Sequence, residues 1–366
     1  MNGFSPYVSA TADAAANQHF FIENNGGKPV CGRVFLRLLP GRGDVPSYRM
    51  WFSNALDATY GAGTTVYANA LCEPWEILRA CVWAVPDFPE TPEEALRIRK
   101  RNAVTLTFEG KEFLHLEPGA VLPCDPFRLP KDAASLALEL EFKGHILPYH
   151  HESLLPVLRK GPGGWTYDVR VPLPVMTGME EDLPMIGFLG DSITQGIGSG
   201  ASRYSYPSLI AEAFAGQASV YNLGIGYARA WDAATDGFWL TRAKQCDPVV
   251  VALGVNDICQ GVSAEELCGN LKAVLLSLRE GGCATLLLTP FPFDWTGEKR
   301  EVWNAVLFYC EEELRRLSSG FLRTDTLLSL DTDEPWKAGF GAHPNAEGHR
   351  RLATAVETEL RKLFHS

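Results

Sequence analysis

The hydrophobic and polar residues of the chain follow two different patterns in its two halves. Up to about residue 175, apolar and polar positions alternate in short segments that Gly, Pro or Asp clusters separate. Period-two alternation predicts β-strands. The segments are 32–39, 47–53, 103–110, 112–119, 135–142 and 165–173, with a short helix predicted around 91–102. Many short strands of this kind are typical of an antiparallel β-sandwich or jelly roll.

From residue 185 onward, short and wholly apolar segments alternate with longer segments of helical period. The predicted strands are 185–190, 219–224, 248–254, 284–292 and 321–328, and the predicted helices are 206–215, 263–280, 299–319 and 345–364. Strands this apolar are buried on both faces, which is typical of a parallel sheet with helices on each side. The second half is therefore predicted to be an α/β domain.

The length of 366 residues exceeds what one ordinary core supports and suits two domains. The acidic, proline-containing stretch 176–184 lies where the pattern changes. We therefore expect an accessory β-sandwich domain over 1–178 and a catalytic domain over 179–366.

The composition excludes several classes of protein. A net charge of −11 argues against nucleic-acid or anionic-membrane partners, and no apolar run is long enough for a membrane span. The N-terminus lacks the pattern of a signal peptide, so we expect a cytoplasmic protein, with a chain already processed as the alternative. Nine cysteines without any C-x-x-C spacing predict free thiols rather than disulfides or a zinc site.

No metal or other cofactor is predicted. The adjacent histidines His150 and His151 are the one pair that suggests a metal site. In a strand, neighbouring side chains point to opposite faces, so the two imidazoles would not bind the same ion.

Four polar or glycine-rich motifs come after predicted strands or before the last helix. They are GDSIT (190–194), NLGIGYAR (222–229), GVND (254–257) and HPN (343–345). Parallel sheets bind ligands beyond the carboxyl ends of their strands. We therefore expect the four motifs to meet at one edge of one sheet.

In this order the motifs resemble those of the SGNH hydrolases, also called the GDSL esterase and lipase superfamily, over about 185–364. The resemblance implies a three-layer αβα, flavodoxin-like domain with a parallel five-stranded sheet. The first half is similar, more loosely, to the β-sandwich that precedes this fold in some two-domain carbohydrate esterases, through WFSNAL (51–56) and LTFEG (106–110).

The resemblance also implies roles for individual residues. Ser192 is the expected nucleophile and His343 the general base that removes its proton. The expected oxyanion donors are the Ser192 backbone N–H, an N–H of the second motif and the Asn256 side chain. His349 competes with His343 as a candidate base, but Pro and Asn follow only His343.

The second motif departs from the family pattern. The family has a glycine five residues after the asparagine that corresponds to Asn222, and here that position is Tyr227. Either Tyr227 donates its N–H or the register shifts and Gly226 donates. Tyrosine suits the position if φ is negative and is strained if φ is positive. The ring would narrow the site, which favours small acyl groups.

The fifth motif departs as well. Phe340 stands three residues before His343, where the family carries an aspartate. We expect a Ser–His dyad in which a main-chain carbonyl accepts a hydrogen bond from Nδ1–H of the histidine. Asp333 is the strongest candidate for a replacement carboxylate.

These features predict a serine esterase that removes small acyl groups, acetyl above all, from a carbohydrate through an acyl-serine intermediate. The expected partner is an acylated oligosaccharide or another small ester. Trp231, Trp295 and Trp336 are candidate sugar platforms, with core packing as the alternative for each. Two alternatives to the function stay open: an SGNH hydrolase of lipids or thioesters, and a carbohydrate-binding protein with impaired catalysis. The oligomeric state is not predicted.

Overall fold

The computed structural model describes residues 6–12, 20–23, 27–40, 47–55, 60–61, 64–65, 72–150, 152–235, 237–293, 295–328 and 343–364. The chain divides into two compact units: Met1–Leu183 with Ala215–Ser219, and Pro184–Phe214 with Val220–Ser366. The domain boundary predicted at 178/179 falls inside strand β16 (Met176–Glu180).

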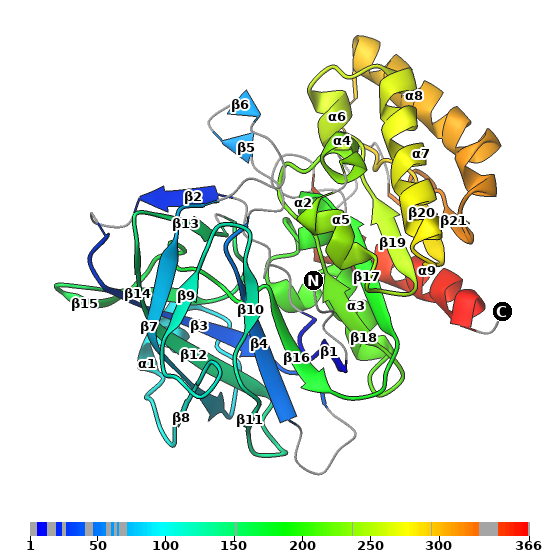
Figure 1. Cartoon of the computed structure of the whole chain (residues 1–366). Helices are drawn as coiled ribbons and strands as arrows, with labels where there is room; N and C mark the ends of the chain where they lie inside the picture. Colours follow the sequence, from blue (N-terminus) through cyan, green and yellow to red (C-terminus); the bar gives the residue numbers. More distant parts are fainter. Residues whose placement is uncertain are drawn as a thin grey trace. The chain divides into compact units, whose positions relative to one another are not determined.

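The N-terminal unit is built from antiparallel sheets (Figure 1). The larger sheet has seven strands in the order β15 (Gly164–Tyr167), β14 (Val157–Gly161), β3 (Val30–Arg37), β12 (Ser135–Gly144), β7 (Trp75–Val85) and β8 (Val104–Thr105), with β9 (Leu114–Leu116) also paired to β7. The second has β1 (Tyr7–Ser9), β16, β4 (Ser47–Ser53) and β10 (Val121–Pro123), with β11 (Phe127–Arg128) on β4. Two small antiparallel sheets of two strands each pair β13 (Ile146–Tyr149) with β2 (Phe20–Glu23), and β5 (Tyr60–Gly61) with β6 (Thr64–Thr65).

Alternate residues of these strands bury two separate apolar clusters. Val34 of β3 and Leu138 of β12 belong to the larger cluster, which also takes in Phe52 of β4. Because this cluster draws on both large sheets, the region is sandwich-like, as predicted. Residues of opposite parity, such as Trp83 of β7, form a smaller cluster that includes a residue of helix α1 (Pro92–Arg97).

The C-terminal unit contains a parallel sheet of five strands, which confirms the α/β prediction. Its order is β18 (Ser219–Asn222), β17 (Met185–Gly190), β19 (Val249–Ala252), β20 (Thr285–Leu288) and β21 (Gly320–Leu322). In chain order this is 2-1-3-4-5, the flavodoxin-like arrangement. Every residue of the first four of these strands is buried, as expected for strands covered on both faces.

Helices surround this sheet in two groups (Figure 1). Helix α3 (Tyr206–Ala213) packs on α9 (Ala346–Phe364), whereas α7 (Ala264–Glu280) packs on α4 (Ala230–Ala234), α5 (Phe238–Ala243) and α8 (Gly297–Glu312). Two short helices, α2 (Ser192–Gln195) and α6 (Val255–Cys259), follow β17 and β19 almost directly. In the described part of the chain, no helix has the length and apolarity needed to cross a membrane.

The ends of several elements differ from the predicted ones. The predicted strand 284–292 ends at Leu288, because Pro290 and Pro292 lack the N–H that a central strand must donate. The predicted helix 91–102 is helical only over Pro92–Arg97, because its C-cap Ile98 already has extended backbone angles. Ser263 caps the N-terminus of α7, with its side chain accepting a hydrogen bond from the Glu266 backbone N–H.

Candidate active site

Ser192 is the first residue of α2, at the carboxyl end of buried strand β17. The turn between them needs glycine at position 190, since a Cβ there would lie 2.0 Å from Thr194 Oγ1. Asp191 caps the helix, with Oδ1 accepting a hydrogen bond from Ile193 N at 2.9 Å. Asp191 therefore supports the turn that presents Ser192.

The structure brings Ser192 together with His343. Ser192 Oγ lies 2.8 Å from His343 Nε2, although the two residues are 151 positions apart in the sequence. This is the contact through which an imidazole withdraws a proton from a serine hydroxyl.

Two contacts hold the His343 segment in place. Gly198 has φ +92°, and a Cβ there would lie 2.4 Å from the Pro344 carbonyl oxygen, so only glycine allows this approach. The Phe293 ring meets the imidazole edge-on, with ring centroids 6.0 Å apart. Sequence reasoning missed both residues, because each contact joins segments that are distant in the chain.

The second motif packs directly against α2. Asn222 Nδ2 donates to the Thr194 carbonyl at 3.1 Å, and Asn222 Oδ1 accepts from Gly224 N at 2.9 Å. A Cβ on Gly224 would lie 2.2 Å from Gln195 N. The predicted convergence of the first and second motifs therefore rests on an asparagine and a glycine that the motif contains.

The third motif contacts the second through Asn256, at the residue that follows Tyr227. Asn256 Nδ2 donates to the Ala228 carbonyl at 2.9 Å. Because an amide NH₂ carries two hydrogens, Asn256 retains a second one for another acceptor. Tyr227 has φ +64°, which is the positive φ at which a tyrosine backbone is strained. Its side chain is 39% exposed. Gly226 is buried.

His349 supports the site from within the core. Its Nδ1 accepts from Tyr206 N and its Nε2 donates to the Ile197 carbonyl, both at 3.3 Å. Burial lowers the pKa of His349 to about 4, so the ring is neutral at pH 7. Tyr206 in turn shares a 2.8 Å hydrogen bond with Thr194 of α2. His349 is thus fixed by two backbone partners beneath α2, whereas His343 contacts the serine.

Two buried carboxyl groups flank the site. Burial, aided by the charge of Asp257, raises the pKa of Asp191 to about 7, and burial raises that of Asp257 to about 6. Asp257 Oδ2 accepts from Ala230 N at 2.9 Å. Among the described residues, one oxygen of each carboxyl group has no hydrogen-bond partner. No group of His, Cys, Asp or Glu suited to a metal occurs within this described part.

The predicted sugar platforms have different surroundings. Trp231 is half-buried in α4, with the Arg229 guanidinium 4.7 Å from its ring centroid. Trp295 is only 4% exposed and packs on Phe293, so it would have to be uncovered before a sugar could stack on it. Trp336, Asp333 and Phe340 lie outside the described residues, and their predicted roles stay predictions.

One protein family matches a stretch of the chain that contains all four motifs. The model of the GDSL-like Lipase/Acylhydrolase family matches residues 188–351. No curated protein matches the chain.

Several solved structures are similar at low identity. They include the psychrotrophic esterase EstA from Pseudoalteromonas sp. (15% identity, 50% of this chain and 99% of that one, TM-score 0.41). A mutant of Axe2, an acetyl-xylooligosaccharide esterase from Geobacillus Stearmophilus, is 22% identical over 48% of this chain and 93% of that one, with a TM-score of 0.38. The salicylyl-acyltransferase SsfX3 from a tetracycline biosynthetic pathway is 16% identical over 92% of this chain and 82% of that one, with a TM-score of 0.40. By its family match, this chain contains a GDSL/SGNH hydrolase domain at residues 188–351, preceded by N-terminal antiparallel β sheets.

Proposed function

We propose that the protein is a serine esterase that removes small acyl groups, acetyl above all, from a carbohydrate. The observation that carries the proposal is the 2.8 Å hydrogen bond between Ser192 Oγ and His343 Nε2. The family match supports esterase or acylhydrolase chemistry. The sugar and the acetyl group are the finer part of the proposal and rest on the residues around the serine.

The reaction follows from this pair. Ser192 Oγ attacks the ester carbonyl carbon while His343 Nε2 takes the hydroxyl proton. The same proton then passes to the departing alcohol, which leaves an acyl-serine. Water, deprotonated by His343, attacks the acyl-serine, the carboxylic acid departs and Ser192 recovers its proton. Oxyanion charge in both steps would be met by the Ser192 N–H, the N–H of Gly226 or Tyr227, and Asn256 Nδ2.

The expected acyl group is small because one aromatic side chain contacts the proposed base and another comes from the motif that supplies a proposed oxyanion donor. Phe293 lies against the imidazole of His343. Tyr227 places a half-exposed ring at the position where the family has glycine. An acetyl group needs less room between such rings than a long acyl chain does.

Ser192→Ala tests the chemistry. We expect this substitution to lower kcat for p-nitrophenyl acetate by about 10³-fold or more, because the nucleophile is lost. Ser277→Ala, at a half-buried serine of α7, is the matched control and should keep the wild-type rate. Equal rates in wild type and Ser192→Ala would exclude the proposed nucleophile.

A substrate series tests the finer part. Acetylated xylo-oligosaccharides and p-nitrophenyl esters from acetate to decanoate would be compared by kcat/KM. A maximum at acetate, together with release of acetate from the sugar, is the expected result. A maximum at octanoate or beyond would favour the lipid-directed alternative. Sugar binding without turnover, and without labelling of Ser192 by an organophosphonate, would favour the binding-protein alternative.

A further inference from the structure

The N-terminal unit contains a pocket of about 590 Å³ on the outer face of its seven-stranded sheet. It lies over the smaller apolar cluster, and its walls come from the end of β7, the segment 86–104 and residues 128–130. The volume is within the range of small-molecule sites. No role in the proposed esterase reaction accounts for this pocket.

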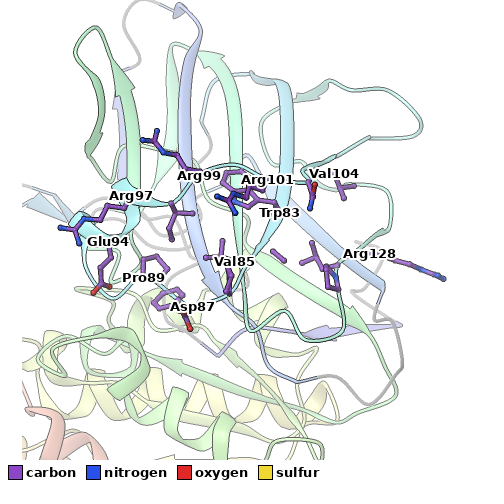
Figure 2. A pocket seen from close by; sticks show the side chains of 17 residues that line it. Trp83, Val85, Asp87, Pro89, Glu94, Arg97, Arg99, Arg101, Val104 and Arg128 are labelled. Carbon is purple, nitrogen blue, oxygen red and sulfur yellow. The ribbon is translucent and has the colours of Figure 1, made fainter.

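Arginine side chains dominate its charge. Arg97, Arg99, Arg101 and Arg128 all line the pocket and are exposed, against two carboxylates, Asp87 and Glu94. In Figure 2, Arg97 and Glu94 lie at one end and Arg128 at the other, with Arg99 and Arg101 between them. The chain as a whole has the opposite sign, with a net charge of −11.

Segment 98–101, which carries Arg99 and Arg101, is attached to the sheet at its even-numbered residues, Ile98 and Lys100. The Ile98 carbonyl accepts from Arg33 Nη1 at 3.3 Å, and Lys100 Nζ donates to Glu139 Oε1 at 2.6 Å. Ile98 has extended backbone angles. Arg99 and Arg101, which alternate with these two anchored residues, are exposed and line the pocket.

The anchor itself is buried and well paired. Arg33 bonds Glu139 Oε2 at 2.6 Å, and its guanidinium lies 4.4 Å from the Trp165 ring centroid and 5.2 Å from that of Trp83. The segment that carries the arginines is thus held in one place before any ligand binds. Pre-organisation of this kind lowers the entropic cost of binding.

None of Arg97, Arg99, Arg101 and Arg128 forms an ion pair with a carboxylate in the described part of the chain. Between them the walls are apolar, with Val85, Phe88 and Leu129 among the lining residues. Guanidinium groups bind carboxylates in a planar, bidentate way, and the apolar walls suit the face of a ring.

We propose that this pocket binds an oligosaccharide that carries carboxylate groups, such as a uronate. The anionic part of the inference rests on the arginines alone, and the sugar part rests on the proposed function. The pocket would hold an acidic region of the glycan, separately from the ester that Ser192 attacks.

Calorimetric titration of the Ser192→Ala full chain tests this, since binding is then measured without turnover. The probes are an oligogalacturonate, a neutral xylo-oligosaccharide and inorganic phosphate. We expect the uronate to bind, more weakly as salt rises, and the other two to bind at least about tenfold less tightly. The double variant Arg99→Ser/Arg101→Ser should lose about 100-fold in affinity, and Arg300→Ser, at an exposed arginine of α8, none.

Three results would overturn the proposal: no uronate binding, unchanged binding in the double variant, or phosphate binding as tight as uronate binding. The double variant in the otherwise native chain should still hydrolyse p-nitrophenyl acetate at the wild-type rate. Loss of esterase activity in Ser192→Ala is a separate measurement, so a failed esterase proposal and a failed binding proposal give different results.

Discussion

Tyr227 occupies a backbone conformation that glycine favours, with φ +64°. For a residue with a Cβ, the left-handed region costs about 1–2 kcal/mol. The strain lies next to the oxyanion donors proposed above, in a motif that other contacts hold rigidly. Its persistence indicates that the surrounding loop, rather than Tyr227 itself, determines the backbone path.

Replacing Tyr227 with two different small residues separates the backbone from the ring. Tyr227→Ala and Tyr227→Gly both remove the ring, but only glycine relieves the positive φ. We expect the Gly variant to be more stable than the Ala variant by about 1 kcal/mol in urea unfolding. At Tyr167, an exposed strand residue without a positive φ, the same pair should show the opposite order. If the Ala variant were more stable than the Gly variant at both positions, Tyr227 would be unstrained.

Asn256 has two tasks at the residue scale. One N–H of its side-chain amide donates a hydrogen bond to the Ala228 carbonyl, and under the proposed function the other donates to the oxyanion. Asn256→Ala should therefore lower kcat by about 10²–10³-fold with a small change in KM, and lower stability by about 1 kcal/mol. Asn270→Ala, at a half-buried asparagine of α7, is the control for both measurements. A loss of stability alone would show that Asn256 only positions the loop.

At the scale of elements, α2 depends on a buried carboxyl group at its N-cap. The pKa of Asp191 is raised to about 7, so the folded protein holds this proton more tightly than the unfolded chain, in which the pKa is about 3.9. The stabilisation is complete below about pH 4 and is lost as pH rises through about 7. Asp191 therefore makes the hydrolase domain less stable on the alkaline side.

Asp191→Asn keeps the side-chain oxygen that accepts from Ile193 N but cannot ionise. We expect this variant to exceed wild type in stability at pH 8 by up to about 4 kcal/mol, a difference that disappears towards pH 4. Urea unfolding at several pH values is the measurement. A difference that does not vary with pH would show that the Asp191 carboxyl does not titrate in this range.

The elements that could be predicted from sequence are those whose pattern is local. Strand β17 is one uninterrupted apolar run and was predicted with its observed ends. Strand β7 was missed, although it has 11 residues. A register shift opposite Glu141 and Phe142 breaks its alternation, so Ile77 and Val82, of opposite parity, enter the same core. A period-two search cannot recognise such a strand.

The same distinction applies to the candidate site. The pairing of Ser192 with His343 was predicted from two short motifs, GDSIT and HPN, each of which is recognised from its own few residues. Gly198 and Phe293 contribute only through their contacts with the His343 segment. No pattern in the sequence around either residue predicts such a contact. The sign of φ at Tyr227 was left open for the same reason, because the loop around it decides the angle.

At the scale of the whole molecule, all nine cysteines are free, and Cys259 alone among them is exposed. Partial burial nevertheless raises the pKa of Cys259, which slows its reaction with thiol reagents. We expect Ellman's reagent to label one thiol in the native protein and the remaining ones only after unfolding. Cys259→Ser should abolish the native reaction, and Cys31→Ser should leave it unchanged. Several thiols reacting at once under native conditions would contradict the burial of seven of the other cysteines and the partial burial of Cys31.

The nucleophile and its base are 151 residues apart in the chain. Four of the five strands of the parallel sheet, β18 to β21, lie between them in the sequence. During synthesis, Ser192 therefore leaves the ribosome long before the imidazole that would activate it. A chain released early, after β21 but before His343, would possess every strand of the sheet and the serine in its turn, yet no base. Under the proposed mechanism, esterase activity is thus a property that the polypeptide acquires only with the last segment of its hydrolase domain.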